Sequence, residues 1–282
     1  MPPLPPAEQL TPHLLRAWSL PVPDDEADKH ARGTVLVVGG AVSTPGAILL
    51  AGLAALRVGA GRLQIATVSE TAVALGVSVP EAMVVGYRSD GSGSLSADCA
   101  GEVDVEGLAG LLVGPGLLGQ AGALELLTAL LPRVGDIPLV LDAVALTVLT
   151  PELLAGRSVP AVLTPNGGEL KALIGEDGTA EQAAARYGAV VATHGVVVSP
   201  DGRTWGDEAG SIGLGTSGSG DVQAGAVVGL LARGAAPEQA AAWGQYLHAA
   251  AGDRLVSRRG RVGFLARELL DELPAVLMTL TA

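Results

Sequence analysis

One segment late in the chain joins a loop of small residues to the start of a helix: Gly215-Thr216-Ser217-Gly218-Ser219-Gly220-Asp221-Val222-Gln223-Ala224-Gly225. Small residues let backbone N–H groups converge on an anion, and the helix N-terminus adds the positive end of its dipole. Asp221 suits a catalytic carboxylate, but an acidic residue there also suits a helix cap. The segment alone therefore leaves an anion site and a capped helix as equal alternatives. No lysine follows the glycines, so it is not a P-loop.

Upstream, short apolar runs alternate with glycine turns and alanine-rich stretches. The run Thr34-Val35-Leu36-Val37-Val38-Gly39-Gly40 predicts a buried strand and a turn, and residues 46–60 predict the following helix. We expect further strands at 62–67, 110–113, 138–141, 161–163 and 190–198, a hairpin around 200–202, and helices at 121–131, from 146, at 169–174, 179–188, 220–233, 237–255 and 264–280. This order predicts an α/β fold, with a mainly parallel sheet and helices on both faces. Ligands bind at the carboxyl ends of such strands, where the glycine-rich turns fall.

Several candidate residues follow these strands. Asp142 comes directly after a buried strand and suits either a site carboxylate or a helix N-cap. Asn166 and Glu169 either reach a ligand or cap the next helix. Gly116 needs no more explanation than a tight turn, although it too faces the expected cleft. His248 lies within an expected helix and is interpreted as a packing residue.

Charge and composition exclude several classes of function. The chain has 282 residues and a net charge of −12, which argues against a nucleic-acid partner because such proteins carry a basic surface. Its single cysteine, Cys99, excludes an internal disulfide, and no residue spacing suggests a tightly bound transition metal. No run is apolar and long enough for a membrane span, and the N-terminus lacks the order of a signal peptide, so we expect a cytoplasmic enzyme.

The sequence predicts a short N-terminal arm followed by one large domain. Residues 1–30 are polar and punctuated by prolines, which predicts an N-terminal arm that packs on the body. Residues 31–282 contain no clean linker, which predicts a single domain. Alanine-rich helices with few charges favour contacts between subunits of a homo-oligomer, although the same composition suits a closely packed monomer.

A set of motifs in fixed order resembles one family over about residues 10–280. The motifs are Val38-Gly39-Gly40 with Gly46-Ala47, Ala54 to Gly61, Pro80 to Val84, Gly114 to Leu117, Leu141-Asp142-Ala143, Leu163-Thr164-Pro165, Gly218-Ser219-Gly220-Asp221, and Tyr246-Leu247-His248 with Ala251-Gly252-Asp253. They resemble the ADP/ATP-dependent NAD(P)H-hydrate dehydratases of the ribokinase-like superfamily. The resemblance implies a three-layer α/β/α fold and a repair reaction. In that reaction ADP (typical of bacterial members) or ATP phosphorylates the hydroxyl of hydrated NADH or NADPH, and loss of phosphate restores the reduced cofactor.

The resemblance also implies which residues form the site. Asp221 would be the catalytic base, with Gly218 and Gly220 beside the transferring phosphoryl group. The substrate would lie against Ala47, Gly116, Asp142, Asn166, Glu169 and Asp221. The nucleotide, with Mg²⁺ bridging its phosphates, would lie against Thr193, His194, Gly195, Ser217, Ser219 and Gly220. A small-molecule kinase of the same fold and a non-catalytic nucleotide-binding relative are the alternatives.

Some positions depart from the family pattern. Thr44-Pro45 stands where the family usually has a tyrosine, and Val144 and Asn166 replace an aspartate and a histidine. A Lys-Gly pair that helps hold the nucleotide is replaced around Thr193-His194-Gly195, and Ser217 replaces a glycine. The phosphoryl-transfer end is thus nearly intact, while contacts on the substrate and nucleotide sides differ.

Overall fold

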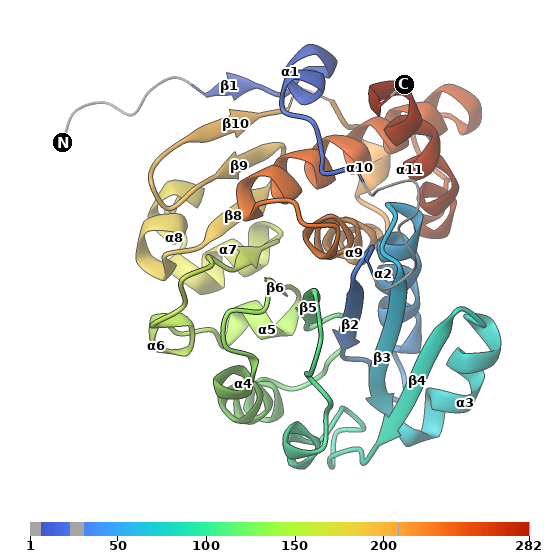
Figure 1. Ribbon diagram of the computed structural model, residues 1–282, viewed down its shortest axis with the longest axis vertical. Coiled ribbons are helices and arrows are strands. Elements are labelled where there is room, and N and C mark those ends of the chain that lie inside the picture. Colours follow the sequence, from blue (N-terminus) through green and yellow to red (C-terminus); the bar gives the residue numbers. More distant parts are fainter. Residues whose placement is uncertain (1–6, 23–30, 208, 282) are drawn as a thin grey trace.

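The computed structural model describes residues 7–22, 31–207 and 209–281. Within them one sheet of ten strands has the order β1-β10-β9-β8-β7-β6-β5-β2-β3-β4 (Figure 1). The strands are β1 (Glu8–Gln9), β2 (Thr34–Val38), β3 (Arg62–Val68), β4 (Ala82–Tyr87), β5 (Gly110–Val113), β6 (Leu139–Leu141), β7 (Val162–Leu163), β8 (Val190–Thr193), β9 (Val196–Val198) and β10 (Thr204–Gly206). Every neighbouring pair from β4 to β8 is parallel, and β9 is antiparallel to both β8 and β10.

Helices cover both faces of this sheet (Figure 1). The first core contains buried side chains of α2 (Pro45–Arg57), α3 (Ser69–Ser78), α9 (Ser219–Ala232), α10 (Pro237–Arg259) and α11 (Ala266–Thr281). The second contains those of α4 (Gln120–Val134), α5 (Val144–Thr147), α6 (Pro151–Leu154), α7 (Gly167–Ile174) and α8 (Ala180–Tyr187). In β2, Val35 and Val37 join the first core while Leu36 and Val38 join the second, because successive side chains of a strand point to opposite faces. The predicted three-layer α/β/α architecture is confirmed.

Close packing of α9 on α2 fixes the position of the glycine-rich segment. A Cβ on Gly225 would collide with the carbonyl oxygen of Ala51, and one on Gly229 would lie 2.6 Å from that of Ala55. The absence of both side chains lets the two helix backbones touch along this contact. The N-terminus of α9 is therefore held firmly at the edge of the sheet.

Two consecutive hairpins complete the sheet beyond its parallel part. Thr193 at the end of β8 pairs with Val196 in β9, and the two turn residues His194 and Gly195 have φ of 44° and 78°. A two-residue turn with both φ values positive matches the twist of a hairpin, which favours glycine at one position. Asp207 follows β10, and its N–H donates to the carbonyl of Gly195 at 2.6 Å.

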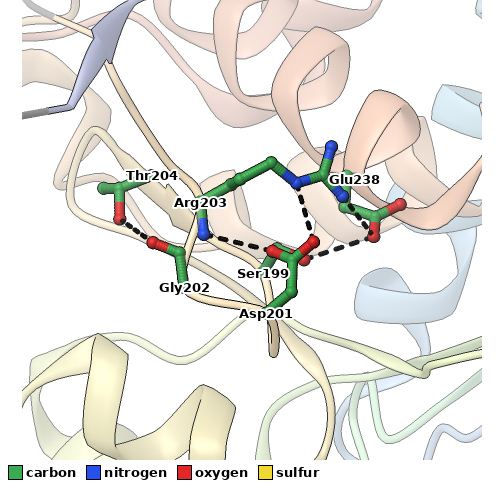
Figure 2. A network of polar contacts seen from close by, with 6 residues as sticks. All are labelled: Ser199, Asp201, Gly202, Arg203, Thr204 and Glu238. Atoms are coloured by element: carbon green, nitrogen blue, oxygen red, sulfur yellow. Dashed lines mark hydrogen bonds and ion pairs between the residues drawn. The ribbon is translucent and has the colours of Figure 1, made fainter. Parts of the chain in front are cut away.

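A polar network attaches the β9–β10 hairpin to α10, as Figure 2 shows. Arg203 Nε donates to Asp201 Oδ2 at 2.8 Å, and its Nη2 donates to Glu238 Oε1 at 3.4 Å. Ser199 Oγ also donates to Glu238 Oε1 at 3.2 Å. Glu238 lies in the first turn of α10, so this network fixes the hairpin relative to the helix.

The described part of the N-terminal arm, residues 7–22, runs beside β10, α10 and α11 (Figure 1). β1 pairs with β10, and the rings of Trp18 and Trp205 stack with centroids 5.3 Å apart. The carbonyl of Trp18 accepts hydrogen bonds from Trp243 Nε1 and Gln239 Nε2. This part of the arm also contains the short helix α1 (Pro12–Ala17). Residues 1–6 and 23–30 of the predicted arm lie outside the described residues.

The structure adds elements that the sequence pattern did not predict. They are β1, α3, β4 and two short 3₁₀ helices, η1 (Ala97–Gly101) and η2 (Ile212–Leu214). The helix expected from residue 146 begins two residues earlier, at Val144, and is followed by the separate α6. The expected strands and hairpin are otherwise found, with ends displaced by a residue or two.

Candidate active site

Neighbouring strands bring polar side chains together at the carboxyl edge of the sheet. Asp142 follows β6 and Thr164 follows β7; Thr164 Oγ1 donates to Asp142 Oδ1 at 2.9 Å. Thr193, at the end of β8, donates from Oγ1 to the carbonyl of Pro165 at 2.6 Å. The turn after β7 thus connects Asp142, a predicted substrate residue, with Thr193, a predicted nucleotide residue.

The orientation of His194 follows from this arrangement. Its Nδ1 lies 3.0 Å from Thr193 Oγ1. Because the hydroxyl proton of Thr193 goes to Pro165, His194 Nδ1 must be the donor in this contact. In the tautomer with a proton on Nδ1 alone, the free acceptor is Nε2. His194 can therefore accept a hydrogen bond from a ligand, a different capability from that of the lysine usual in the resembled family.

The glycine-rich segment forms the first turn of α9. Gly218 is the N-cap with φ of 87°, in the left-handed region that favours glycine. Ser219 Oγ and His248 Nε2 are 2.8 Å apart and both buried. Among the described residues the N–H groups of Gly220 and Asp221 have no acceptor, and the space beside Gly220 is open. This helix end can therefore bind an anion through backbone donors.

The N-cap residues of α9 and α5 exclude the N-cap role that the sequence offered for two aspartates. The N-cap of α9 is Gly218 and that of α5 is Ala143, so neither Asp221 nor Asp142 caps its helix. His248 is buried with Ser219 as its hydrogen-bond partner, which agrees with its interpretation as a packing residue, and it also lines the cleft described below.

For Asn166 and Glu169 the capping alternative is what the structure shows. Asn166 Oδ1 accepts hydrogen bonds from the N–H groups of Gly168 and Glu169, and Glu169 Oε2 accepts one from Asn166 N. This reciprocal pair is a capping box, which stabilises the start of α7. Their predicted contact with substrate is additional to this structural role.

Three acidic side chains influence one another at this edge. Burial and, as the smaller contribution, the negative charge of Glu169 raise the pKa of Asp221 to about 6. Burial raises the pKa of Asp142 to about 8, with contributions from Asp221 and Glu169. Burial also raises the pKa of Glu169. Near neutral pH Asp142 therefore holds its proton while Asp221 is ionised, an arrangement that separates a neutral acid from a base.

A cleft of about 430 Å³ lies beside the N-terminus of α9. Five of the six predicted nucleotide residues line it, namely Thr193, His194, Gly195, Ser219 and Gly220, together with Asn166. Ser217 lies in the loop just before α9 and is not among the lining residues. The cleft is also lined by residues that the sequence did not single out, including Asp207, Ser211, Leu214, Gln245 and Ala249. None of the described lining residues is a lysine or arginine, so backbone N–H, hydroxyl, amide or imidazole groups would hold any phosphate there.

Ala47 and Gly116 lie outside this cleft but close to each other. A Cβ on Gly116 would lie 3.0 Å from that of Ala47, and Thr44 Oγ1 donates to the carbonyl of Gly116 at 2.7 Å. These residues follow β2 and β5, which are neighbours in the sheet. The predicted residues thus fall into a nucleotide group in the cleft, a carboxylate group beside it and a small-residue group at β2 and β5.

Other features of the described residues bear on function. A larger hollow of about 630 Å³ lies near α3, β4 and η1 and contains none of the predicted site residues. No cluster of three or more histidine, cysteine or acidic side chains suited to hold a metal ion occurs in the part of the chain that the structure describes. No described helix has the length and apolarity to cross a membrane.

Comparison with known proteins places this geometry in a family. The NAD(P)H-hydrate dehydratase family model matches residues 35–275. The chain belongs to this family. An ADP-dependent (S)-NAD(P)H-hydrate dehydratase of Xanthomonas campestris pv. campestris is 43% identical over 279 residues, which cover 93% of each chain. The matched range contains every predicted site residue of this NAD(P)H-hydrate dehydratase family member.

Solved structures of the family agree with the fold. An ADP/ATP-dependent NAD(P)H-hydrate dehydratase of Bacillus subtilis, co-crystallised with ATP/Mg²⁺, superposes with a TM-score of 0.84 at 30% identity and covers 97% of this chain and 99% of its own. A ribokinase-like superfamily protein of Enterococcus faecalis superposes with a TM-score of 0.80 at 25% identity, covering 97% and 96%. This family member therefore has the ribokinase-like fold.

Proposed function

We propose that this protein dehydrates hydrated NADH and NADPH through a phosphorylated intermediate, with ADP as the preferred phosphoryl donor and ATP as the alternative. Family membership supports the reaction. The observation that carries the mechanism is the partly buried Asp221 carboxylate directly beside the open N–H groups at the start of α9. A base and an anion site are adjacent there, as transfer of a phosphoryl group to a hydroxyl requires.

The first chemical step uses both features of α9. Asp221 accepts the proton of the substrate hydroxyl while the hydroxyl oxygen attacks the terminal phosphorus of the nucleotide. The N–H groups of Gly220 and Asp221 stabilise the negative charge on the transferring phosphoryl group. With ADP the products are AMP and the phosphorylated hydrate. Phosphate then departs with the C–O bonding electrons, a ring proton is lost, and the double bond of the reduced cofactor returns.

Asp142 supports this step by remaining neutral. Since burial raises its pKa to about 8, it adds no negative charge beside Asp221 when the phosphates bind. Its proton remains available for a hydrogen bond to an oxygen of the substrate.

Magnesium fits this site as a companion of the nucleotide. The described residues form no metal cage, which is typical of Mg²⁺ held by substrate phosphates and waters. When bound, Mg²⁺ would neutralise part of the negative charge of the phosphates. A cytoplasmic location and a homo-oligomeric assembly stay predictions from the sequence.

The test is recovery of NADH absorbance from hydrated NADH with Mg²⁺ and either ADP or ATP. We expect Asp221→Asn to reduce the rate by about 10²- to 10⁴-fold, the usual contribution of a general base, while nucleotide affinity stays close to that of the wild type. Asp271→Asn is the matched control, since that carboxylate is exposed and pairs only with Arg57 at the surface.

Two outcomes contradict the proposal. Wild-type turnover by Asp221→Asn removes Asp221 from the mechanism. A stable phosphorylated product without recovered NADH identifies a kinase of the same fold instead.

A further inference from the structure

Asp207 presents an unused hydrogen-bond acceptor in the cleft. Its Oδ1 accepts a hydrogen bond from the N–H of Ala209 at 2.8 Å. Its Oδ2 is buried and has no hydrogen-bond partner among the described residues. Leaving a buried carboxylate oxygen without a partner costs free energy. A polar ligand in the cleft would relieve that cost.

The backbone holds this carboxylate in place. Asp207 N donates to the carbonyl of Gly195 at 2.6 Å, and a Cβ on Gly195 would lie only 2.7 Å from the carbonyl oxygen of Asp207. The residue thus sits directly on the turn that carries His194. The acceptor is therefore oriented before a ligand arrives, which favours selective binding.

The surroundings of Asp207 exclude a phosphate as its ligand group. It is the only carboxylate among the described lining residues, and no lysine or arginine lines the cleft to pair with it. The acidic Asp253 of α10 acts on it electrostatically, and the pKa of Tyr246 is raised by burial and, to a smaller extent, by Asp207 in turn. A phosphate placed there would meet negative charge, whereas the start of α9 offers backbone donors.

The remaining neighbours suit a neutral organic group. Leu214 and Ala249 give the cleft apolar lining, and Ser211 adds a hydroxyl. Apolar walls with few oriented polar groups are typical of sites for small organic ligands. A nucleoside offers what this carboxylate lacks, because its ribose hydroxyls and its exocyclic amine are hydrogen-bond donors.

We propose that Asp207 is a specificity residue that recognises the nucleoside part of the phosphoryl donor, and so directs the phosphates toward the N-terminus of α9. This inference rests on the proposed nucleotide dependence. It explains how a cleft without cationic side chains distinguishes a nucleotide from a simple polyphosphate. The base and ribose bind at Asp207, and the phosphates bind at Gly220 and Asp221.

The experiment compares ADP with inorganic pyrophosphate, which has the phosphates but no nucleoside. Dissociation constants for both are measured by titration calorimetry with Mg²⁺ on the wild type, Asp207→Asn and the control Asp201→Asn. Asp201 is half-exposed in the turn between β9 and β10 and lies outside the cleft. Thermal unfolding shows that each variant is folded.

We expect Asp207→Asn to weaken ADP binding about tenfold or more, as loss of a hydrogen bond to a charged group does, and to leave pyrophosphate binding unchanged or tighter. In the recovery assay the KM for ADP rises while kcat changes little, since only uniform binding is lost. Asp201→Asn leaves both constants unchanged.

Three results overturn the inference: an equal loss of affinity for both ligands, no loss for either, or no ADP binding by the wild type. Failure of the proposed dehydratase function can be distinguished from failure of the Asp207 inference. If Asp207→Asn selectively weakens ADP binding but the wild type recovers no NADH with ADP or ATP, the specificity role stands and the dehydratase reaction does not.

Discussion

On acidification, activity should be lost at a pH that is unusually high for an enzyme whose general base is a carboxylate. Burial and the charge of Glu169 raise the pKa of Asp221 to about 6, and only the ionised form accepts a proton. The ionised fraction is then about nine-tenths at pH 7, half at about pH 6 and about one-tenth at pH 5. We therefore expect kcat/KM for the hydrate to fall about tenfold between pH 7 and pH 5. A base with an ordinary aspartate pKa would lose little over this range.

The measurement is the initial rate of NADH recovery at saturating ADP and low hydrate concentration, with the rate without enzyme subtracted at every pH. A profile that stays flat down to pH 5 would refute the reasoning. The terminal phosphate of ADP also titrates near this pH, so wild-type data alone leave two sources for the loss.

The variant Glu169→Gln separates these sources. Glutamine retains the oxygen that accepts from Asn166 N, so the capping box of α7 survives. It removes the like charge that raises the pKa of Asp221. The acid limb should therefore move to lower pH, whereas titration of ADP is unaffected by the substitution. An unmoved limb assigns the pH dependence to the nucleotide and contradicts the coupling of Asp221 with Glu169.

Two further predictions concern stability. Gly225→Ala should lower the free energy of unfolding in urea by about 1–3 kcal/mol, because its Cβ would meet Ala51 O. The control Gly220→Ala should not lower it, since the space beside Gly220 is open. Equal stabilities of the two variants would contradict the close α2–α9 contact. Asp142→Asn should weaken the pH dependence of stability between about pH 4 and pH 8. The folded protein keeps a proton on Asp142 that the unfolded chain releases, so wild-type stability falls as pH rises through this window, and an unchanged slope in the variant would contradict the raised pKa.

The architecture was predictable from the sequence where local signals agreed. Thr34–Val38 is a β-branched run that ends in Gly39-Gly40, and it forms β2. The segment around α3 carried weaker signals, since the helix begins after Val68 without a side-chain cap and exposes Val73 and Val77. β4 borders α3 at the edge of the sheet, where its partly exposed side chains blur the alternation of a half-buried strand.

The site was predictable only in part, for a physical reason. Asp221 and the strand-end residues could be identified because their positions follow from the order of elements along the chain. Their protonation could not, since the pKa of Asp142 depends on burial and on the distance to Asp221. Asp207 was missed because its unpartnered oxygen is a property of the folded cleft, and no local pattern around Asp207 marks it.

The net charge of −12 and the binding of a polyanionic nucleotide are compatible because attraction at this site is local. Backbone donors at Gly220, which lines the cleft, and at the adjacent Asp221 take the place of cationic side chains. Asp142 is neutral at physiological pH, which removes one of the three nearby negative charges before the phosphates arrive. The charge that remains on Asp221 is the one that the reaction uses, since the base must be ionised to accept the hydroxyl proton. Burial of these carboxylates therefore has two effects: it reduces the negative charge that the bound phosphates meet, and it sets the pKa of the catalytic base.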